Sequence, residues 1–395
     1  MELHPMYRTF PVRHRCRATD MNTASINEQR SLRTAAALLF IVLCPAAMGA
    51  QGGSRDIVDK VDCQRCSIRL EGAFKLVGTD VTSSGPPTAV EVDGSRRIWV
   101  AVSDELTKIY DANGRFLQLL GRKGGGPNEY VGPYGLSALP GDSMLVFDSD
   151  NGRVLVVDKA LVAIRAIRLP GFLYPILPLE WPGSVVLAGM ILTPSAAGWP
   201  IHMASFGQPD LQVRNSIGYD QGTLRPNSPT DQSQRLAVAR SGGFWTADVL
   251  RYRISRWSND GTRVETIVRS PSWFDKPSKD WIGNPQTPPP PRVTGLREDS
   301  EGLLWVFVQV AGKNWRQGWP TLTPGVREVS TRSVRYENLF ASMIEVVNPK
   351  TQRVIARSEI SSYAIATLSD GRLALYSRDE DDVPVVTIVR PKLVR

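Results

Sequence analysis

Residues 93–100 (DGSRRIWV) place a glycine-bearing turn directly before a short hydrophobic strand, and this arrangement recurs along the chain. The turns occur at intervals of 42 to 69 residues. The six copies lie at Asp93-Gly94, Gly141-Asp142, Gly183, Gly242-Gly243, Gly302 and Asp370-Gly371. Turn residues of this kind supply the positive φ angles that tight hairpins require. Each copy therefore predicts a β-hairpin.

A second turn follows later in most of these units. Residues 109–115 (IYDANGR) place an apolar pair before the turn and an alternating strand after it. Counterparts lie at Val157-Asp158, Phe206-Gly207, Trp257-Ser258 and Val347-Asn348. Two hairpin turns per unit describe a four-stranded antiparallel sheet, and six such sheets predict an all-β, six-bladed β-propeller. Trp99, Trp245 and Trp305 occupy matching positions on second strands and are expected in the core.

Closure of the ring is predicted from the two ends of this region. The last unit has strands near residues 363–368, 372–377 and 383–389 but lacks an outermost one, and an open sheet edge is a liability. Residues 67–77 (SIRLEGAFKLV) form an unassigned strand, which we expect to pair with residues 383–389. The alternative is a pair of β-sandwiches divided at the proline-rich residues 285–291. The turn pattern continues across those prolines and favours one ring over residues 67–395.

The first 50 residues are typical of an export signal. Arg30 and Arg33 precede the apolar run AAALLFIVLC at 35–44, which is too short to span a bilayer and fits a signal-peptide core. We expect Met21 to be the initiator, with an upstream extension before it, and cleavage near Ala50. No later stretch is long and apolar enough to span. An exported protein is therefore predicted, in the periplasm, at the cell surface or outside the cell.

Charge argues against a nucleic-acid partner. The formal net charge is +8, and +3 of it lies in the first 50 residues, which leaves +5 for the rest. That balance is mild, and no dense run of Lys and Arg provides a phosphate-binding footprint. Residues 51–66 form an N-terminal segment with a C-x-x-C motif. In an exported chain, Cys63 and Cys66 are expected to form a disulfide, since a strand rather than a helix follows them.

The segment 121–130 (GRKGGGPNEY) follows the first predicted outer strand. It resembles the G-x-x-G-x-G-P-x-E-[FY] segment of the exported bacterial six-bladed β-propellers related to NHL-repeat proteins. The preceding D-x-x-G-x-F at 111–116 and the C-x-x-C motif are similar to that family as well. The detailed resemblance covers residues 60–135. It implies a ring and an exported location, but no reaction.

The strands of a blade are lettered a to d from inside to outside, so the b–c and d–a loops share one face of the ring. All the long predicted connections fall on that face. Long loops on a rigid scaffold often bind ligands. On this long-loop face, Arg122, Lys123 and Glu129 are predicted to form a polar rim of the central channel, or else a locally paired chain reversal. The insertion at 311–338 carries Trp315, Arg316, Trp319 and Arg327, which suit a carbohydrate or anionic ligand unless the tryptophans only cover the blade edge.

These features predict a binding module without catalytic residues or a cofactor, whose partner is a carbohydrate, an anionic small molecule or a protein. Only three histidines are present, and neither a G-x-S-x-G nor an H-E-x-x-H motif occurs, so the usual hydrolase and zinc-protease residues are missing. No metal site is predicted. The alternative is a calcium-dependent lactonase or lyase with its site in the central channel, because such an enzyme needs only Glu, Asn and Asp from inner strands.

Overall fold

The computed structural model describes residues 54–57, 59–82, 85–180, 183–191, 198–206, 210–218, 233–274, 286–320 and 333–395. The predicted signal peptide, Arg327 and parts of four long connections lie outside these ranges. Within them, no helix is long or apolar enough to cross a membrane.

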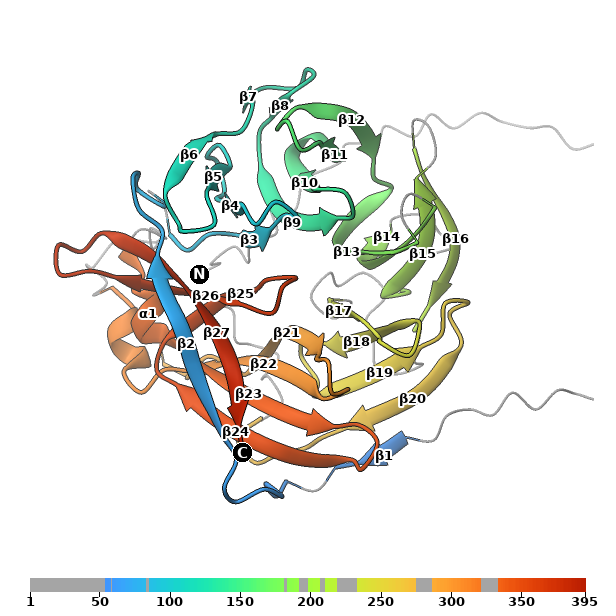
Figure 1. The fold of residues 1–395 in the computed structure, drawn as a ribbon, viewed down its shortest axis with the longest axis vertical. Coiled ribbons are helices and arrows are strands. Elements are labelled where there is room, and N and C mark those ends of the chain that lie inside the picture. Colours follow the sequence, from blue (N-terminus) through green and yellow to red (C-terminus); the bar gives the residue numbers. More distant parts are fainter. Residues whose placement is uncertain are drawn as a thin grey trace, which may run out of the picture. The chain divides into compact units, whose positions relative to one another are not determined.

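Six antiparallel sheets form the blades of a β-propeller, as predicted (Figure 1). Blade 1 contains β3 (Ala89–Val92), β4 (Ile98–Ala101), β5 (Lys108–Tyr110) and β6 (Phe116–Leu119). Blade 2 contains β9 (Pro133–Leu139), β10 (Ser143–Asp148), β11 (Arg153–Val157) and β12 (Ala163–Arg168). Blade 3 contains β13 (Gly171–Glu180), β14 (Ser184–Ile191), β15 (Ile201–Phe206) and β16 (Leu211–Ile217).

The second half of the ring repeats this arrangement. Blade 4 contains β17 (Gln234–Val238), β18 (Phe244–Asp248), β19 (Arg253–Trp257) and β20 (Arg263–Val268). Blade 5 contains β21 (Arg292–Glu298), β22 (Leu304–Ala311), β23 (Phe340–Asn348) and β24 (Arg353–Ile360). Blade 6 contains β25 (Tyr363–Thr367), β26 (Leu373–Arg378), β27 (Pro384–Val394) and β2 (Ser67–Lys75). Each innermost strand contacts the innermost strand of the next blade, and β25 contacts β3.

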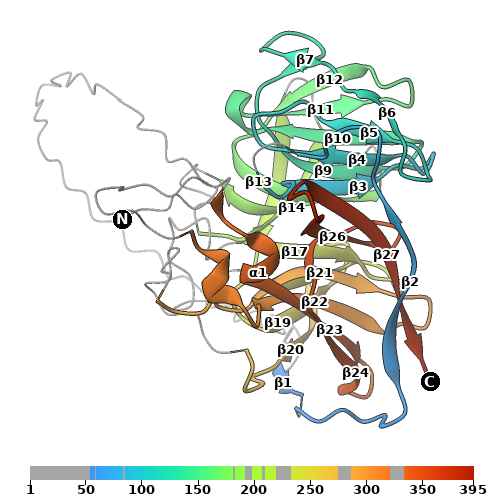
Figure 2. The same cartoon turned by 90° about the vertical axis from the view of Figure 1, so that its left-hand side faces the viewer.

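The ring closes as the sequence predicted. β2 lies antiparallel to β27, with Ser67 opposite Val394 and Lys75 opposite Thr387. Figures 1 and 2 show these two strands side by side along blade 6. β27 extends to Val394, five residues further than the predicted strand, so the N-terminal strand covers a longer edge than expected.

The recurring turn residues act through local hydrogen bonds. Asp111 Oδ1 accepts from the amides of Asn113 and Arg115 in one c–d turn, and Asp158 does the same in the next blade. Side-chain acceptors of this kind fix a turn without help from the rest of the fold. The predicted core tryptophans are indeed buried, with Trp99 0%, Trp245 2% and Trp305 3% exposed.

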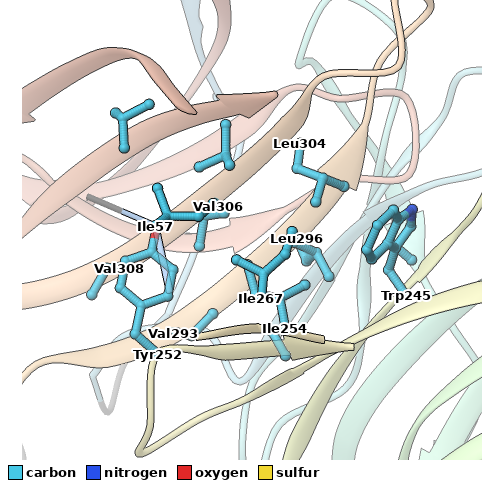
Figure 3. Packing of buried hydrophobic residues seen from close by; sticks show 14 of the residues in the cluster. Ile57, Trp245, Tyr252, Ile254, Ile267, Val293, Leu296, Leu304, Val306 and Val308 are labelled. Carbon is cyan, nitrogen blue, oxygen red and sulfur yellow. The ribbon is translucent and has the colours of Figure 1, made fainter. Parts of the chain in front are cut away.

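An N-terminal belt, residues 54–66, was not predicted. β1 (Ser54–Asp56) pairs in parallel with β20 on the outer edge of blade 4, and Val61 bridges to Val354 on blade 5. Ile57 inserts into the apolar core between those two blades (Figure 3). The predicted disulfide is present between Cys63 and Cys66, at the point where the chain passes from blade 5 to blade 6. The chain before β2 therefore joins blades 4, 5 and 6.

Candidate ligand-binding face

The glycine-rich segment forms a compact turn at the junction of blades 1 and 2. β7 (Arg122–Lys123) pairs in parallel with β8 (Glu129–Tyr130). Arg122 Nε donates to Glu129 Oε1 at 2.8 Å, and the Gly126 amide donates to Glu129 Oε2 at 2.8 Å. That amide and the Arg122 guanidinium hold the pKa of Glu129 below its usual range. Lys123 Nζ donates to the Asp104 carbonyl.

Side chains of blade 2 hold the same turn by donating hydrogen bonds to the carbonyl groups of the turn. Arg153 donates to the carbonyl oxygens of Gly125 and Glu129, at 2.9 and 2.8 Å, while Asn151 donates to that of Gly124. These contacts give the segment a structural role between two blades. Of the predicted rim residues, Arg122 and Lys123 are exposed, and Arg122 keeps 77% of its side chain in solvent.

The insertion of blade 5 contains η2 (Trp315–Gly318) and α1 (Tyr336–Leu339). Trp315 is 8% exposed and packs in a small cluster with Val334, Leu339 and Phe340. The exposed guanidinium of Arg316 lies 4.4 Å from the centre of the Trp315 ring, and Trp319 is half-buried against the cluster. Trp315 thus contributes to packing, and Arg316 carries the charge that faces solvent.

The innermost strands bring tyrosines and an arginine towards the axis of the ring. Tyr134 and Tyr174 meet across blades 2 and 3, with ring centroids 6.0 Å apart. Arg235 Nε donates to the Thr294 carbonyl of blade 5 at 3.0 Å. Burial raises the pKa values of Tyr174 and Tyr363, and Arg235 opposes both shifts. Because the charge of Arg235 affects the pKa values of tyrosines on blades 3 and 6, Arg235 lies near the centre of the ring.

Glu91 connects blade 1 to blade 6 at the closing junction. Its Oε1 accepts from the amides of Val92 and Ser369, at 2.7 and 2.8 Å. Burial raises the pKa of Glu91 to about 7 against these hydrogen bonds, and the charge of Asp370 raises it further. Neither Glu91 nor the tyrosines of the channel were identified from the sequence, because residues on different blades have no fixed spacing in the chain.

A small pocket of about 40 Å³, lined by several polar side chains, lies between blades 3 and 4. Thr246 and Asp248 of β18 and Ser255 of β19 line it and are at most 7% exposed. Half-buried arginines also line it, namely Arg251, Arg253 and Arg263.

Strand alternation explains which side chains reach the pocket. Thr246 pairs with Ser255 across β18 and β19, and both point towards blade 3 together with Phe244 and Trp257. Their sequence neighbours Ala247 and Ile254 point towards blade 5 instead. Since successive side chains of a strand alternate between its faces, the same strands present Thr246 and Ser255 to blade 3 and Ala247 and Ile254 to blade 5.

The pocket opens on the long-loop face. Arg251 lies in the b–c turn of blade 4, and Pro200 follows the long b–c connection of blade 3. Gly218 and Gln234 flank the connection between the two blades. This is the face on which the long connections lie, but none of the predicted site residues lines the pocket.

The described residues bring together no group of three His, Cys, Asp or Glu side chains that could hold a metal ion. His202, the one histidine outside the predicted signal region, is fully buried between Ser216 Oγ and the Gly189 carbonyl. Burial lowers its pKa to about 4, so it stays neutral at physiological pH.

No family model matches the chain. No curated protein sequence matches it either. Among solved structures, it resembles a candidate exported protein from Bacteroides fragilis, with 14% identity, a TM-score of 0.54, and coverage of 86% of this chain and 99% of that one. It also resembles a DUF4221 family member from Bacteroides vulgatus, with 11% identity, a TM-score of 0.56, and coverage of 83% and 99%. A more distant match is virginiamycin B lyase from Staphylococcus aureus, with 12% identity, a TM-score of 0.43, and coverage of 82% and 99%. At these identities the likeness concerns the fold alone.

Proposed function

We propose that the chain is an exported binding protein of the NHL-related six-bladed propeller type, and that it takes a small ligand in the pocket between blades 3 and 4. The observation that carries this proposal is a polar pocket in a place where a propeller normally buries apolar side chains. Its volume of about 40 Å³ is far below the roughly 300–1,000 Å³ of sites for drug-sized ligands, so only a small group of a ligand can enter it. The export signal and the resemblance of residues 60–135 support the location.

The pocket suits binding better than a reaction. Its polar side chains carry hydroxyls, guanidiniums, the amide of Gln234, the indole N–H of Trp257 and one carboxylate, which is already paired with Arg251 at 2.9 Å. A nucleophile next to a base, the usual sign of covalent catalysis, is not among its lining residues. The arrangement can hold and orient a ligand through hydrogen bonds and charge.

A pair of bulky substitutions tests the proposal. Arg253→Trp places a bulky ring among the residues that line the pocket, and Arg240→Trp places the same side chain at an exposed a–b turn of the same blade, on the opposite face. We expect ligand-observed NMR with sugars, sugar acids, amino acids and phosphates to detect a ligand that the wild type and Arg240→Trp bind and that Arg253→Trp does not. Equal binding by both variants would exclude the pocket.

One observation keeps the calcium-dependent lactonase or lyase as a second candidate. Glu91 has a pKa of about 7 and lies at an innermost strand, where an acid or base of that strength can transfer protons near neutral pH. A channel calcium site would raise the melting temperature on addition of calcium and lower it with EDTA, by linkage. A melting temperature that responds to neither reagent removes this candidate.

A further inference from the structure

The belt lies on the outside of blades 4 and 5 in the way that an extended peptide binds to a sheet edge. β1 adds a parallel strand to β20, and the Ile57 amide continues the pairing by donating to the Val268 carbonyl at 3.1 Å. Further along, the Asp62 amide donates to the Val354 carbonyl at 2.8 Å. In this mode of recognition, main-chain hydrogen bonds supply affinity and side-chain contacts supply specificity.

One apolar side chain fixes the position of the belt. Ile57 is 5% exposed and inserts between the two blades, among Tyr252, Ile254 and Ile267 (Figure 3). Moving a buried isoleucine into water is unfavourable. This side chain is therefore an anchor for residues 54–62.

Acidic side chains of the belt meet arginines of both blades. Asp59 accepts from Arg269 Nη2, directly after β20, at 2.9 Å, and from Arg357 of β24. Asp62 accepts from Arg353 Nη1 of β24 at 2.9 Å. The edge of β20, the core around Ile57 and these three arginines together form the belt-binding surface. It recognises an extended strand, an isoleucine and two acids at a fixed spacing.

A short turn joins residues 54–62 to their own ring. The disulfide between Cys63 and Cys66 closes this turn, and the Cys66 amide donates to the Cys63 carbonyl at 3.2 Å. β2 begins directly afterwards at Ser67 and pairs with β27. Residues 54–62 can therefore leave their position as a unit, while β2 stays in place and keeps the ring closed.

We propose that the belt-binding surface is an interface between two copies of this chain, which exchange residues 54–62. The chain's own segment is the occupant that the structure shows to fit, and the segment of a second copy makes the same bonds. Exchange of an identical element is a low-cost route to a dimer, because no contact is lost. Within one molecule the tether gives the segment a high effective concentration, so the monomer prevails in dilute solution and the exchanged dimer increases with protein concentration.

Charge exchange at the Asp62–Arg353 pair tests the proposal at the surface, away from the core. The two side chains are well exposed, at 46% and 62%. Asp62→Arg and Arg353→Asp each bring two like charges together when the segment lies on its own ring or on an identical copy. In a mixed dimer with exchanged segments, both pairs again combine opposite charges.

The two full-length variants would be co-expressed, one of them with a C-terminal tag, and native mass spectrometry would measure the untagged copies that co-purify. We expect the mixed dimer to exceed the dimer of either variant alone by about tenfold at equal protein concentration, because two like-charge contacts become two favourable pairs.

Two further variants show whether the dimer forms by exchange. Asp62→Arg/Arg353→Asp within one chain has opposite charges in every arrangement, so it should dimerise no more than the wild type. Ile57→Asp in both members of the mixed pair should abolish the mixed dimer, since an unpaired carboxylate is costly to bury in the apolar core. Circular dichroism checks that each variant keeps its sheets.

The absence of a mixed dimer of Asp62→Arg and Arg353→Asp would overturn the proposal. A mixed dimer that persists with Ile57→Asp would also overturn it, because the contact would then lie elsewhere. If no mixed dimer forms but a fluorescent peptide of residues 54–62 binds the Ile57→Asp protein, the surface receives a separate peptide partner instead of a second copy.

Discussion

The two faces of blade 4 have opposite properties although the same strands build them. Towards blade 5, Ile254 and Ala247 join an extensive apolar core that includes Trp245, Leu304 and Val306 (Figure 3). Towards blade 3, the apolar cluster is smaller and gives way to the polar pocket. Burial of apolar area is the main source of stability in a propeller, at about 25 cal/mol per Å². The first interface therefore holds the ring together, and the second gives up part of that stability to keep polar groups in place.

The largest effect is expected at the buried ion network that the interface between blades 4 and 5 contains beside its apolar core. Glu345 is fully buried and accepts from Arg269, Arg357 and Tyr252. Glu345→Ala would leave the two arginines with only the partly exposed carboxylate of Asp59, so we expect a loss of about 4 kcal/mol in the free energy of unfolding. Urea denaturation measures it. Asp59→Asn, at the more exposed end of the same network, serves as the control and should cost much less. A loss below 1 kcal/mol for Glu345→Ala would show that this interface does not depend on the network.

A core substitution gives the next effect in size. Ile254 is 0% exposed in β19, among Tyr252, Ile267 and Leu296. Ile254→Ala should lower the free energy of unfolding by about 3 kcal/mol, from lost transfer energy and the cavity that remains. Differential scanning calorimetry and urea denaturation check it. The variant should still bind the pocket ligand once folded, because its side chain points away from blade 3. Loss of binding in the folded variant would mean that the two faces are coupled.

The junction of blades 1 and 6 adds a polar contact that responds to pH. The folded protein binds the Glu91 proton more tightly than the unfolded chain, because burial raises the pKa from 4.5 to about 7. Stability should therefore fall as the pH rises from 4.5 to 7, by about 2 kcal/mol after allowance for partial exposure. In Glu91→Gln this slope should disappear. Unfolding free energies of both proteins across that range test it, and parallel curves would rule out Glu91 as the source.

The sequence was sufficient for the ring because its signals are local. Each Gly or Asp turn fixes one hairpin, as the bonds of Asp111 and Asp158 show, and a missing outer strand required a partner such as β2. The belt was missed because β1 has only three residues and pairs with a strand about 210 residues away. Its disulfide was found because the two cysteines are close in the chain.

The sequence also contains a weaker signal of the pocket, in the strands that line it. The second strands β4 (IWVA) and β22 (LWVFVQVA) are apolar along most of their length, as strands buried on both faces must be. β18 (FWTAD) and β19 (RISRW) instead place Thr246, Asp248, Arg253 and Ser255 on one face, beside Phe244 and Trp257. Alternation in a middle strand of a blade indicates a polar gap between blades. Which blade faces that gap depends on the closed ring, and the chain alone does not supply it.

The smallest change in unfolding free energy is expected at Ser255, the residue next to Ile254. Ser255 follows Ile254 in β19 but faces the pocket, where its Oγ shares a hydrogen bond with Thr266 Oγ1 at 3.1 Å. Ser255→Ala removes that one neutral bond next to a cavity that water can enter, so the free energy of unfolding should change by less than about 1 kcal/mol. Binding of the pocket ligand should weaken several-fold, because the pocket loses one of the hydroxyls that line it. Urea denaturation and NMR titration give the two quantities. If Ser255→Ala destabilises the protein as much as Ile254→Ala, the polar face is part of the structural core and the pocket has no separate role.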